Sequence, residues 1–544
     1  MDVSTASARK ISNHIPLVVI VTGLLLGTAA FWGVNKSILG LFHDDGIYAV
    51  VGKAVAQGDG YRIVSLPTAP AQTKYPFVYS YLLSWLWAIE PSFPQNIALL
   101  KALNVAIFVG IFFAAVYYYW RSSRGSTTAA TVFGLAVCTN PIIFGFTDYV
   151  LSDLLLVLIT LIALLSCAGI NAARASCSHL FTLAVIVAIA CLTRRAALPL
   201  VFAGALHAFS FRGWRGAGWF LIALSLIVAP WLVWLSFHAQ QPANPLFAYY
   251  IAYDLNGAST GDLAGWVSSR ASILAGNGRH LLNMFDLFYL TPLLPGSGLL
   301  IGFFSLLGLI VSARGNDPFL RALVISSVAL LLVWPFHPGR YLAPLAPVIV
   351  LFLFRGVLWG KSWVGARLAD HWARQWLAQL AWCPVAVMLL LNGVWLSSFL
   401  LMTDDRTTRS LYGRRVPYGW RGFEESFAWI REHTVPETVL ATAYDPMYYL
   451  YTGRRAIRPA LHRPATYFYP YGKGKPDVGS VAEIKPQLTK LDVGYLIIDP
   501  MDGYAEGQAT IKLLEDLVLT YGEQAEKVFA SDDGKHRIYR IVSH

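Results

Sequence analysis

Four aspartates stand beside or within apolar stretches of the sequence and are the first candidates for chemistry: Asp44, Asp45, Asp148 and Asp153. A carboxylate near the depth of the hydrocarbon core of a membrane is costly, so acids at such positions commonly serve a function. In a partly buried pair such as Asp44 and Asp45, one carboxylate can accept a proton while a hydrogen-bond donor holds the other. The alternative is that one of them caps a helix that begins at Gly46.

Asp148 and Asp153 allow different interpretations. Asp148 follows Thr147 at an expected helix start, where N-capping competes with a substrate-binding role. Asp153 lies about one turn further into the expected span, where capping does not explain it. We expect Asp153 to make a polar contact inside the helix bundle, to one of the arginines.

Four basic residues in the same part of the chain could bind an anion: Lys74, Arg194, Arg195 and Arg340. The planar fork of an arginine can grip two oxygens of one phosphate, which a single point charge cannot do. The alternative for each arginine is that it extends from a helix end to the lipid headgroups. The sequence therefore offers both halves of a transfer site, namely bases and an anion pocket.

Aromatic and histidine side chains have weaker claims to a role. Tyrosines in residues 75–81 and 247–253 could stack on sugar rings, although interfacial aromatic belts are commoner. The adjacent carboxylates at 44 and 45 could also hold a divalent cation, which leaves metal dependence open. Three histidines lack any metal-ligand spacing and are expected to have ordinary polar roles: His43, His280 and His337.

The composition shows which kind of element must position these residues. The chain has 544 residues, of which 56% are hydrophobic and only 13% are charged. Its mean hydropathy is +0.52. Such values indicate that most of the chain lies in lipid. Residues 403–544 carry 19 basic and 19 acidic residues, so the net charge of +11 belongs to residues 1–402. A balanced soluble part of this kind does not indicate a nucleic-acid partner.

Eleven apolar segments are long enough to cross a membrane as helices. Nine of them lie near 15–34, 97–119, 127–147, 150–169, 217–237, 297–313, 319–336, 341–356 and 378–402. The remaining two share residues 179–211, which are too many for one helix and are interrupted at residues 193–195. The sequence thus predicts a helical membrane domain over residues 1–402.

The charges between the segments predict the orientation. With a cytoplasmic N-terminus, the cytoplasmic loops hold 13 basic residues against three acidic ones, Asp2, Asp317 and Asp370. This asymmetry agrees with the positive-inside rule. Residues 35–96, 238–296 and 403–544 are then extracytoplasmic. We expect a multi-pass protein of the plasma membrane, such as the inner membrane of a bacterium.

Residues 403–544 are expected to form a separate soluble domain of the α/β class. An amphipathic run at 424–433 predicts a helix, and residues 438–443 and 493–499 predict strands. None of the five cysteines lies in this domain or at CxxC spacing. The cysteine pattern therefore predicts neither a disulfide framework nor a zinc site.

From Phe31 to about Pro347 the chain resembles the GT-C superfamily of glycosyltransferases that use lipid-phosphate sugars. The nearest branch comprises protein O-mannosyltransferases, aminoarabinose transferases and lipopolysaccharide-core sugar transferases. Six segments carry the resemblance in order: His43–Tyr48, Lys74–Pro76, Asp148–Asp153, Leu192–Arg195, Ala229–Trp231 and Gly339–Pro347.

The resemblance implies a polyprenyl or dolichyl monophosphate sugar as donor and an acidic residue of the first external loop as base. Asp44 or Asp45 would be that base. Lys74 would correspond to the basic residue that opens the family's Lys-Pro-Pro motif and contacts the lipid phosphate. Tyr75 replaces the first proline here, which weakens this assignment. Tyr341 lies in the last of the six segments and would join the substrate-binding residues.

These observations together predict an inverting glycosyltransferase that acts at the outer face of the membrane. Its donor would be an undecaprenyl-phosphate hexose or pentose, and its acceptor an envelope glycan, a lipid or a protein. One alternative is a transporter or flippase for a lipid-linked or sugar substrate, which would show paired repeats with broken helices. Another is a non-catalytic scaffold, which would leave the aspartate pair without a task.

Overall fold

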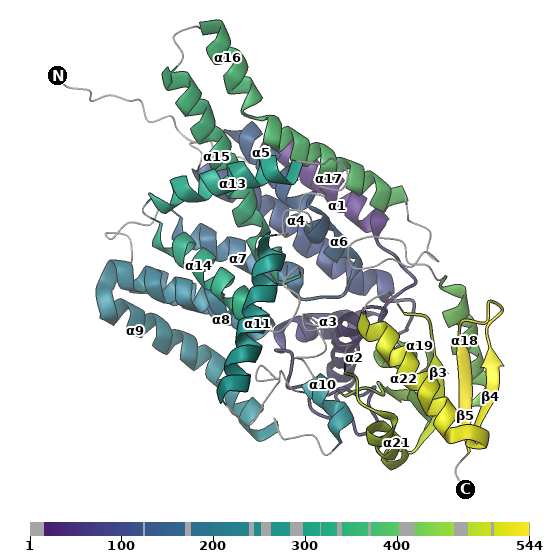
Figure 1. Ribbon diagram of the computed structural model, residues 1–544. Coiled ribbons are helices and arrows are strands. Elements are labelled where there is room, and N and C mark those ends of the chain that lie inside the picture. Colours follow the sequence, from purple (N-terminus) through teal and green to yellow (C-terminus); the bar gives the residue numbers. More distant parts are fainter. Residues whose placement is uncertain are drawn as a thin grey trace.

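The computed structural model shows a helical bundle with a small mixed sheet at one end (Figure 1). The structure describes residues 16–122, 126–168, 176–238, 244–251, 263–282, 297–315, 317–334, 340–367, 371–401, 419–461, 477–501 and 505–542. The predicted domain boundary at 402/403 lies outside these residues, as does His337.

The helices of the bundle coincide with the apolar segments of the sequence. They are α1 (Leu17–Gly33), α4 (Ile97–Ser122), α5 (Thr127–Cys138), α6 (Pro141–Gly145), α7 (Asp153–Cys167), α8 (Cys177–Thr193), α9 (Leu198–His238), α13 (Ser297–Ala313), α14 (Pro318–Val333), α15 (Ala346–Arg367) and α17 (Cys383–Leu401). Large apolar side chains point outward from them, among them Leu299 with 82% of its surface exposed. Such a surface suits lipid rather than water.

Within the described residues, four helical segments are long and apolar enough to cross a membrane, and a fifth results if the bent pair α5–α6 is one span. Shorter apolar helices include α1, α7, α8, α13 and α14, at positions where the sequence predicts spans. The helical class is confirmed. The number of eleven spans stays a prediction.

The long helix α9 is two helices in space. Arg212 and Gly213 have non-helical dihedral angles, and the φ of Gly213 is 58°. A Cβ on Gly204 would lie 2.4 Å from the ring of Phe220, so the chain folds back on itself beyond the turn. This agrees with two successive apolar segments, one ending near 211 and the next beginning near 217.

Small residues allow a very close helix contact between α13 and α15. A Cβ on Gly308 would lie 1.7 Å from the carbonyl oxygen of Phe352, and one on Gly356 would lie 1.9 Å from that of Phe304. Any side chain at either position would force the two backbones apart. Close approach through small residues is typical of helices in lipid, where van der Waals packing drives association.

The C-terminal part is an α/β domain, as the sequence predicts. Its sheet has the order β2-β1-β3-β5-β4, with β1 parallel to β2 and β3, and β5 antiparallel to β3 and β4. The strands are β1 (Val439–Ala441), β2 (Arg455–Ile457), β3 (Val493–Ile498), β4 (Ala525–Ala530) and β5 (Arg537–Ile541). The helices are α18 (Arg421–His433), α19 (Asp445–Thr452), α21 (Val481–Lys490) and α22 (Ala505–Tyr521).

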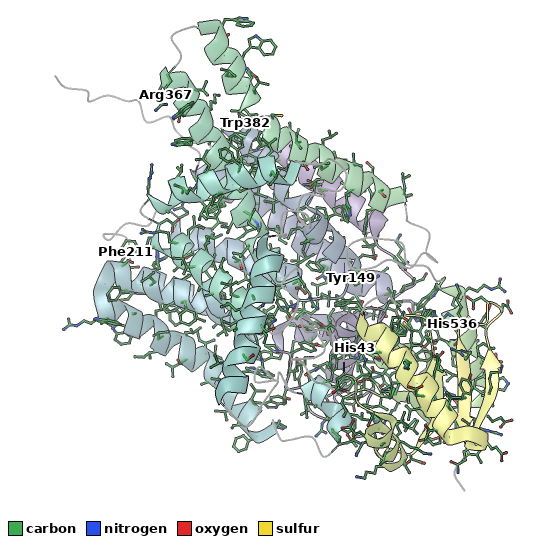
Figure 2. All side chains as sticks on the ribbon, viewed as in Figure 1. His43, Tyr149, Phe211, Arg367, Trp382 and His536 are labelled. Carbon is green, nitrogen blue, oxygen red and sulfur yellow. The ribbon has the colours of Figure 1, made fainter. Side chains whose placement is uncertain are left out.

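The remaining helices lie between the bundle helices along the chain. α2 (His43–Gln57) and α3 (Val78–Ile89) belong to the first predicted external loop, and α2 packs against α19. Others are α10 (Ala248–Ile251), α11 (Leu263–Leu282) and α16 (His371–Leu380), with short 3-10 turns η1 (Phe146–Asp148), η2 (Arg195–Ala197), η3 (Pro245–Phe247) and η5 (Arg340–Leu345). Figure 2 shows Arg367 at the end of the molecule away from His43.

A reporter fused after Met402 tests the orientation. We expect a periplasmic reporter such as alkaline phosphatase to be active there and a cytoplasmic reporter to be inactive, because the basic loops place that junction outside. A reporter pair fused after Ser122, next to Arg121, is the matched control and is expected to show the reverse pattern. Cytoplasmic activity at the first junction would move the whole candidate site to the wrong side of the membrane.

Candidate active site

The first turn of α2 carries the aspartate pair. α2 begins at His43, its N-cap residue Phe42 makes no side-chain cap, and Asp44 and Asp45 follow inside the first turn. The alternative that one of them caps a helix beginning at Gly46 is wrong, because the helix begins three residues earlier. The unpaired N–H groups of a helix start favour negative charge in that turn.

Asp44 is held by two donors. Its Oδ2 lies 2.6 Å from Nη1 of Arg340, and its Oδ1 accepts a hydrogen bond of 2.7 Å from the Tyr75 hydroxyl. Its side chain is 16% exposed. Lys74, the neighbour of Tyr75, adds a second positive charge nearby.

Arg340 joins two helix starts through a single guanidinium. Its Nη1 binds Asp44, while its Nε lies 3.1 Å from both carboxylate oxygens of Asp153 and its Nη2 lies 2.9 Å from Oδ2. Asp153 is the first residue of α7 and also accepts a hydrogen bond of 2.6 Å from Nη1 of Arg194. The predicted contact between Asp153 and an arginine is confirmed, although Asp153 begins its helix rather than lying a turn inside it.

Arg194 and Arg340 are buried, at 6% and 9% exposure. Each is ion-paired within the protein, so neither extends to the headgroups. The ring of Tyr341 lies 5.2 Å from the Arg194 guanidinium carbon, which places this tyrosine beside the cluster. A planar cation over an aromatic face adds to the attraction.

Lys74 and Arg195 approach from the loop before α3 and from η2. Nζ of Lys74 donates to the carbonyl oxygen of Tyr249 at 2.8 Å and lies 3.9 Å from the centre of that ring. Arg195 donates to the carbonyl oxygen of Thr73 at 3.0 Å, next to Lys74 in the chain. The structure therefore brings all four predicted cations to one region.

The pKa values of the two buried aspartates shift in opposite directions. Burial alone would raise the pKa of Asp44, but the charges of Arg340 and Lys74 and the hydrogen bond from Tyr75 hold that pKa well below its usual range. Burial raises the pKa of Asp45 to about 8, against the partial attraction of Lys101. Asp44 is therefore ionised at neutral pH, and Asp45 is largely protonated.

Lys74 is also perturbed. Burial lowers its pKa to about 8, the attraction of Asp44 opposes this, and Arg458, Arg340 and Arg195 lower it further. These three arginines reach Lys74 from different parts of the chain. The region around Asp44 therefore has more positive than negative charge.

Asp148 makes a separate ion pair. It ends η1, so the alternative that it caps a helix start is wrong. Its Oδ1 lies 3.1 Å from Nζ of Lys101 and accepts from the backbone N–H of Asn35 at 2.7 Å. These contacts join α4, η1 and the chain that follows α1. A substrate-binding role for Asp148 stays a prediction.

The C-terminal domain contacts the aspartate loop directly. Nε2 of His43 lies 2.8 Å from Oδ1 of Asp445, the first residue of α19. A Cβ on Gly46 would lie 2.8 Å from Pro446, so only glycine permits this approach. Figure 2 shows His43 on the side of the bundle that faces the sheet domain, where His536 lies.

Sequence reasoning missed several residues of this region, although each leaves a signal. Lys101 is a charge within an apolar span, and Asp445-Pro446 is a typical helix start. Tyr249 and Tyr250 were more simply explained as belt residues. Their rings instead lie 4.9 and 5.6 Å from His43.

Comparison with solved structures identifies the fold. ArnT from Cupriavidus metallidurans, bound to undecaprenyl phosphate, superposes with a TM-score of 0.56 at 13% identity over 97% of this chain and 98% of that one. The oligosaccharyltransferase of Archaeoglobus fulgidus in the apo form gives a TM-score of 0.54 at 11% identity, over 97% and 74%.

The same oligosaccharyltransferase in complex with Zn and sulfate gives a TM-score of 0.50 at 13% identity, over 94% and 72%. By sequence, no family model and no curated protein matches the chain. The structural likeness nevertheless extends over almost the whole chain and includes the sheet domain. The chain therefore has the fold of ArnT and of this oligosaccharyltransferase, which is the GT-C fold that the resemblance implies.

Proposed function

We propose that this protein transfers a sugar from a polyprenyl-phosphate donor to an acceptor hydroxyl at the outer face of the membrane, with inversion at the anomeric carbon. The observation that carries the proposal is the single guanidinium of Arg340, which bridges Asp44 and Asp153 among three further cations. Arg340 thus contacts the proposed base, Asp44, and also belongs to the proposed anion pocket.

The reaction divides between the two halves of the site. The acceptor hydroxyl gives its proton to Asp44 while its oxygen attacks the anomeric carbon. The bond from that carbon to the phosphate oxygen breaks on the opposite face, and the lipid phosphate leaves with the electron pair. Positive charges fixed where the leaving phosphate gains charge stabilise the transition state. Arg340, Arg194 and Lys74 supply them.

The contacts of Asp44 in the absence of donor link donor binding to the basicity of Asp44. Arg340 holds the Asp44 pKa low, and an ionised carboxylate with a low pKa is a weak base. The donor phosphate competes with Asp44 for Nη1 of Arg340 and for the field of Lys74. Drawing either charge toward the phosphate makes Asp44 a stronger base when the donor is in place.

A divalent cation does not fit this cluster well. Asp44 and Asp153 already bind guanidinium groups, and Lys74 adds another positive charge close to Asp44. A divalent cation needs carboxylate oxygens free of such competitors. The local charge at Asp44 favours an anion instead, although one structural neighbour is a complex with Zn and sulfate.

The transporter alternative gains no support from the described helices. It predicts corresponding broken helices in two halves of the bundle. Among the residues that the structure describes, one helix pair is bent in this way, α5 with α6 at 60°.

The C-terminal domain, including the turn at residues 451–455, is proposed to close over the loop and contribute to acceptor choice.

Arg340→Ala tests the phosphate pocket. We expect donor affinity to fall roughly ten- to a hundredfold, because a hydrogen bond to a charged group contributes about 1.5–3 kcal/mol. Arg340→Lys keeps the charge but loses the fork and is expected to be impaired as well. Donor titration of the protein in nanodiscs measures both.

The matched control is Arg367→Ala, which removes an exposed arginine at the far end of the molecule and is expected to leave donor affinity unchanged. Normal donor affinity in a folded Arg340→Ala protein would remove this residue from the pocket. Mass spectrometry of envelope glycans with and without the gene would then identify the sugar and the acceptor.

A further inference from the structure

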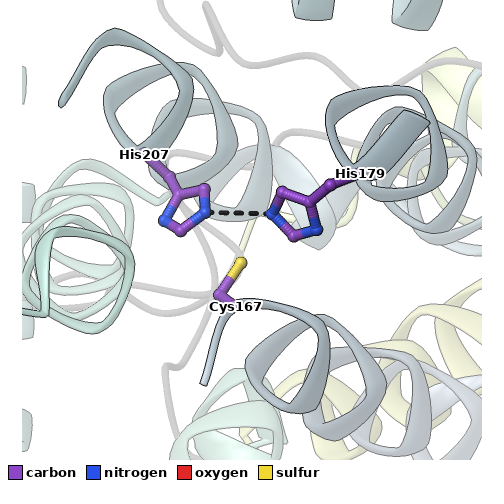
Figure 3. Close-up of side chains that lie close together, drawn as sticks. All are labelled: Cys167, His179 and His207. Atoms are coloured by element: carbon purple, nitrogen blue, oxygen red, sulfur yellow. Dashed lines mark hydrogen bonds between the residues drawn. The ribbon is translucent and has the colours of Figure 1, made fainter. Parts of the chain in front are cut away.

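Three potential metal ligands meet at the end of the bundle that the sequence predicts to be cytoplasmic. Cys167 is the last residue of α7, His179 lies in the first turn of α8, and His207 lies in the first half of α9. Their Sγ and Nε2 or Nδ1 atoms all lie within 4.8 Å of one another. Figure 3 shows the thiol pointing toward the space between the two imidazole rings.

The distance between the two imidazoles suits a shared ion. Nε2 of His179 lies 3.2 Å from Nε2 of His207. Zn²⁺ binds imidazole nitrogen at about 2.0–2.1 Å, so two such ligands of a tetrahedral ion lie roughly 3.3 Å apart. The sulfur of Cys167 lies within 4.8 Å of both imidazoles and is the third potential ligand.

The two imidazoles present metal-binding nitrogen atoms to each other. The hydrogen bond between them uses the proton of one ring and the lone pair of the other. If both rings instead carry their proton on Nδ1, both Nε2 atoms can donate a lone pair to one ion, and the Cys167 thiolate can coordinate the same ion.

The surroundings leave room for a fourth ligand. A cavity of about 600 Å³ is lined by Cys167, His207, Ser312, Asp317 and Arg355, among others. Three protein ligands would leave one position of a tetrahedral ion toward this cavity, where water can complete it. One thiolate with two imidazoles is a donor set of zinc-class ions rather than of Mg²⁺ or Ca²⁺.

We propose that Cys167, His179 and His207 form a binding site for a zinc-class transition-metal ion, which fastens α7, α8 and α9 to one another. On binding, the Cys167 thiol releases its proton to solvent and the thiolate coordinates the ion. The site lies outside the donor pocket, but α7 begins at Asp153 and α8 is followed directly by Arg194. The ion would therefore steady the two helices that carry this ion pair.

Cobalt titration of the tag-free, full-length protein in nanodiscs tests the site. We expect the metal-stripped protein to take up one Co²⁺ with a thiolate-to-metal charge-transfer band and the d–d bands of tetrahedral coordination. Zn²⁺ is expected to displace the cobalt and to raise the midpoint of thermal unfolding, because it binds only the folded site.

Two variants and two matched controls identify the ligands. Cys167→Ser should abolish the charge-transfer band, and His179→Gln, at a half-buried position, should weaken Co²⁺ binding at least about tenfold. Cys177→Ser removes a free thiol outside the site, and His238→Gln removes a histidine that is hydrogen-bonded to the carbonyl oxygen of Trp234. Both should leave the charge-transfer band and the Co²⁺ affinity unchanged.

The outcomes are distinct even if one variant folds poorly. A band that survives in Cys167→Ser, or disappears in Cys177→Ser, would overturn the assignment. The same holds if wild-type protein shows no band, or if folded His179→Gln binds Co²⁺ as tightly as wild type. In that case the two histidines are a simple hydrogen-bonded pair.

Discussion

Asp44→Asn is expected to lower kcat by about 10²- to 10⁴-fold while the protein stays folded and inserted, because loss of a general base typically has this effect. The asparagine oxygen can still accept the hydrogen bond from Arg340, and its amide nitrogen can donate to the Tyr75 hydroxyl, so both contacts of the aspartate keep a partner. It cannot take the acceptor proton. Transfer from a synthetic polyprenyl-phosphate sugar, followed by mass spectrometry, measures the rate.

Asp45→Asn is the matched control for this prediction. Asp45 is 2% exposed and largely protonated at neutral pH, so the variant is expected to keep near-normal turnover. If Asp45→Asn abolished transfer and Asp44→Asn did not, the base assignment would be reversed. Near-normal turnover in both variants would move the search for the base to Asp148 and Asp153.

The same variant reports the protonation state of Asp45. Burial raises its pKa to about 8 from an ordinary value of 3.8, so the neutral carboxyl favours the folded state. This contribution is complete below about pH 4 and is lost as the pH rises toward 8. Asparagine does not ionise, so Asp45→Asn should lose less stability than wild type over that interval.

Asp153→Ala is expected to destabilise the protein by about 3–5 kcal/mol, the usual effect of removing one partner from a buried ion pair. Asp153 is 2% exposed and accepts hydrogen bonds from both Arg194 and Arg340. Without it, two guanidinium groups face each other inside the bundle with only Asp44 to balance them. Unfolding in detergent micelles, followed by tryptophan fluorescence, measures the loss.

Glu526→Ala provides the control for Asp153→Ala. It breaks an exposed ion pair with Arg540 on the sheet domain, and such pairs contribute little to stability. A loss of stability in Asp153→Ala no larger than in this control would show that the buried cluster is not a structural support. Its arginines would then be held mainly by other contacts.

The helices could be predicted from the sequence because their signal is local. A run of about 20 apolar residues is unstable in water and must satisfy its backbone polar groups internally in lipid, whatever surrounds it. Where the structure describes these apolar segments, they are accordingly helical. The turn within α9 is also local, since Gly213 accepts a positive φ at little cost.

The residue types of the candidate site could be recognised for a related reason. A charge in an apolar stretch is costly, so Asp44, Asp153 and Arg340 are conspicuous without any knowledge of the fold. The sequence alone did not identify the residues with which they pair. Adjacent residues favoured capping by Asp44 and Asp148, but in the structure Asp44 lies inside the first turn of α2 and Asp148 ends η1. Their oxygens bind groups from distant parts of the chain instead.

Only the tertiary structure decided these pairings. Arg340 is 296 residues from Asp44 and 187 from Asp153, and His43 is 402 from Asp445. The energy of an ion pair depends on distance and burial, and neither can be read from the order of residues along a chain. The cluster of Cys167, His179 and His207 is invisible in the sequence for the same reason, since its members share no motif spacing and meet only where three helices pack.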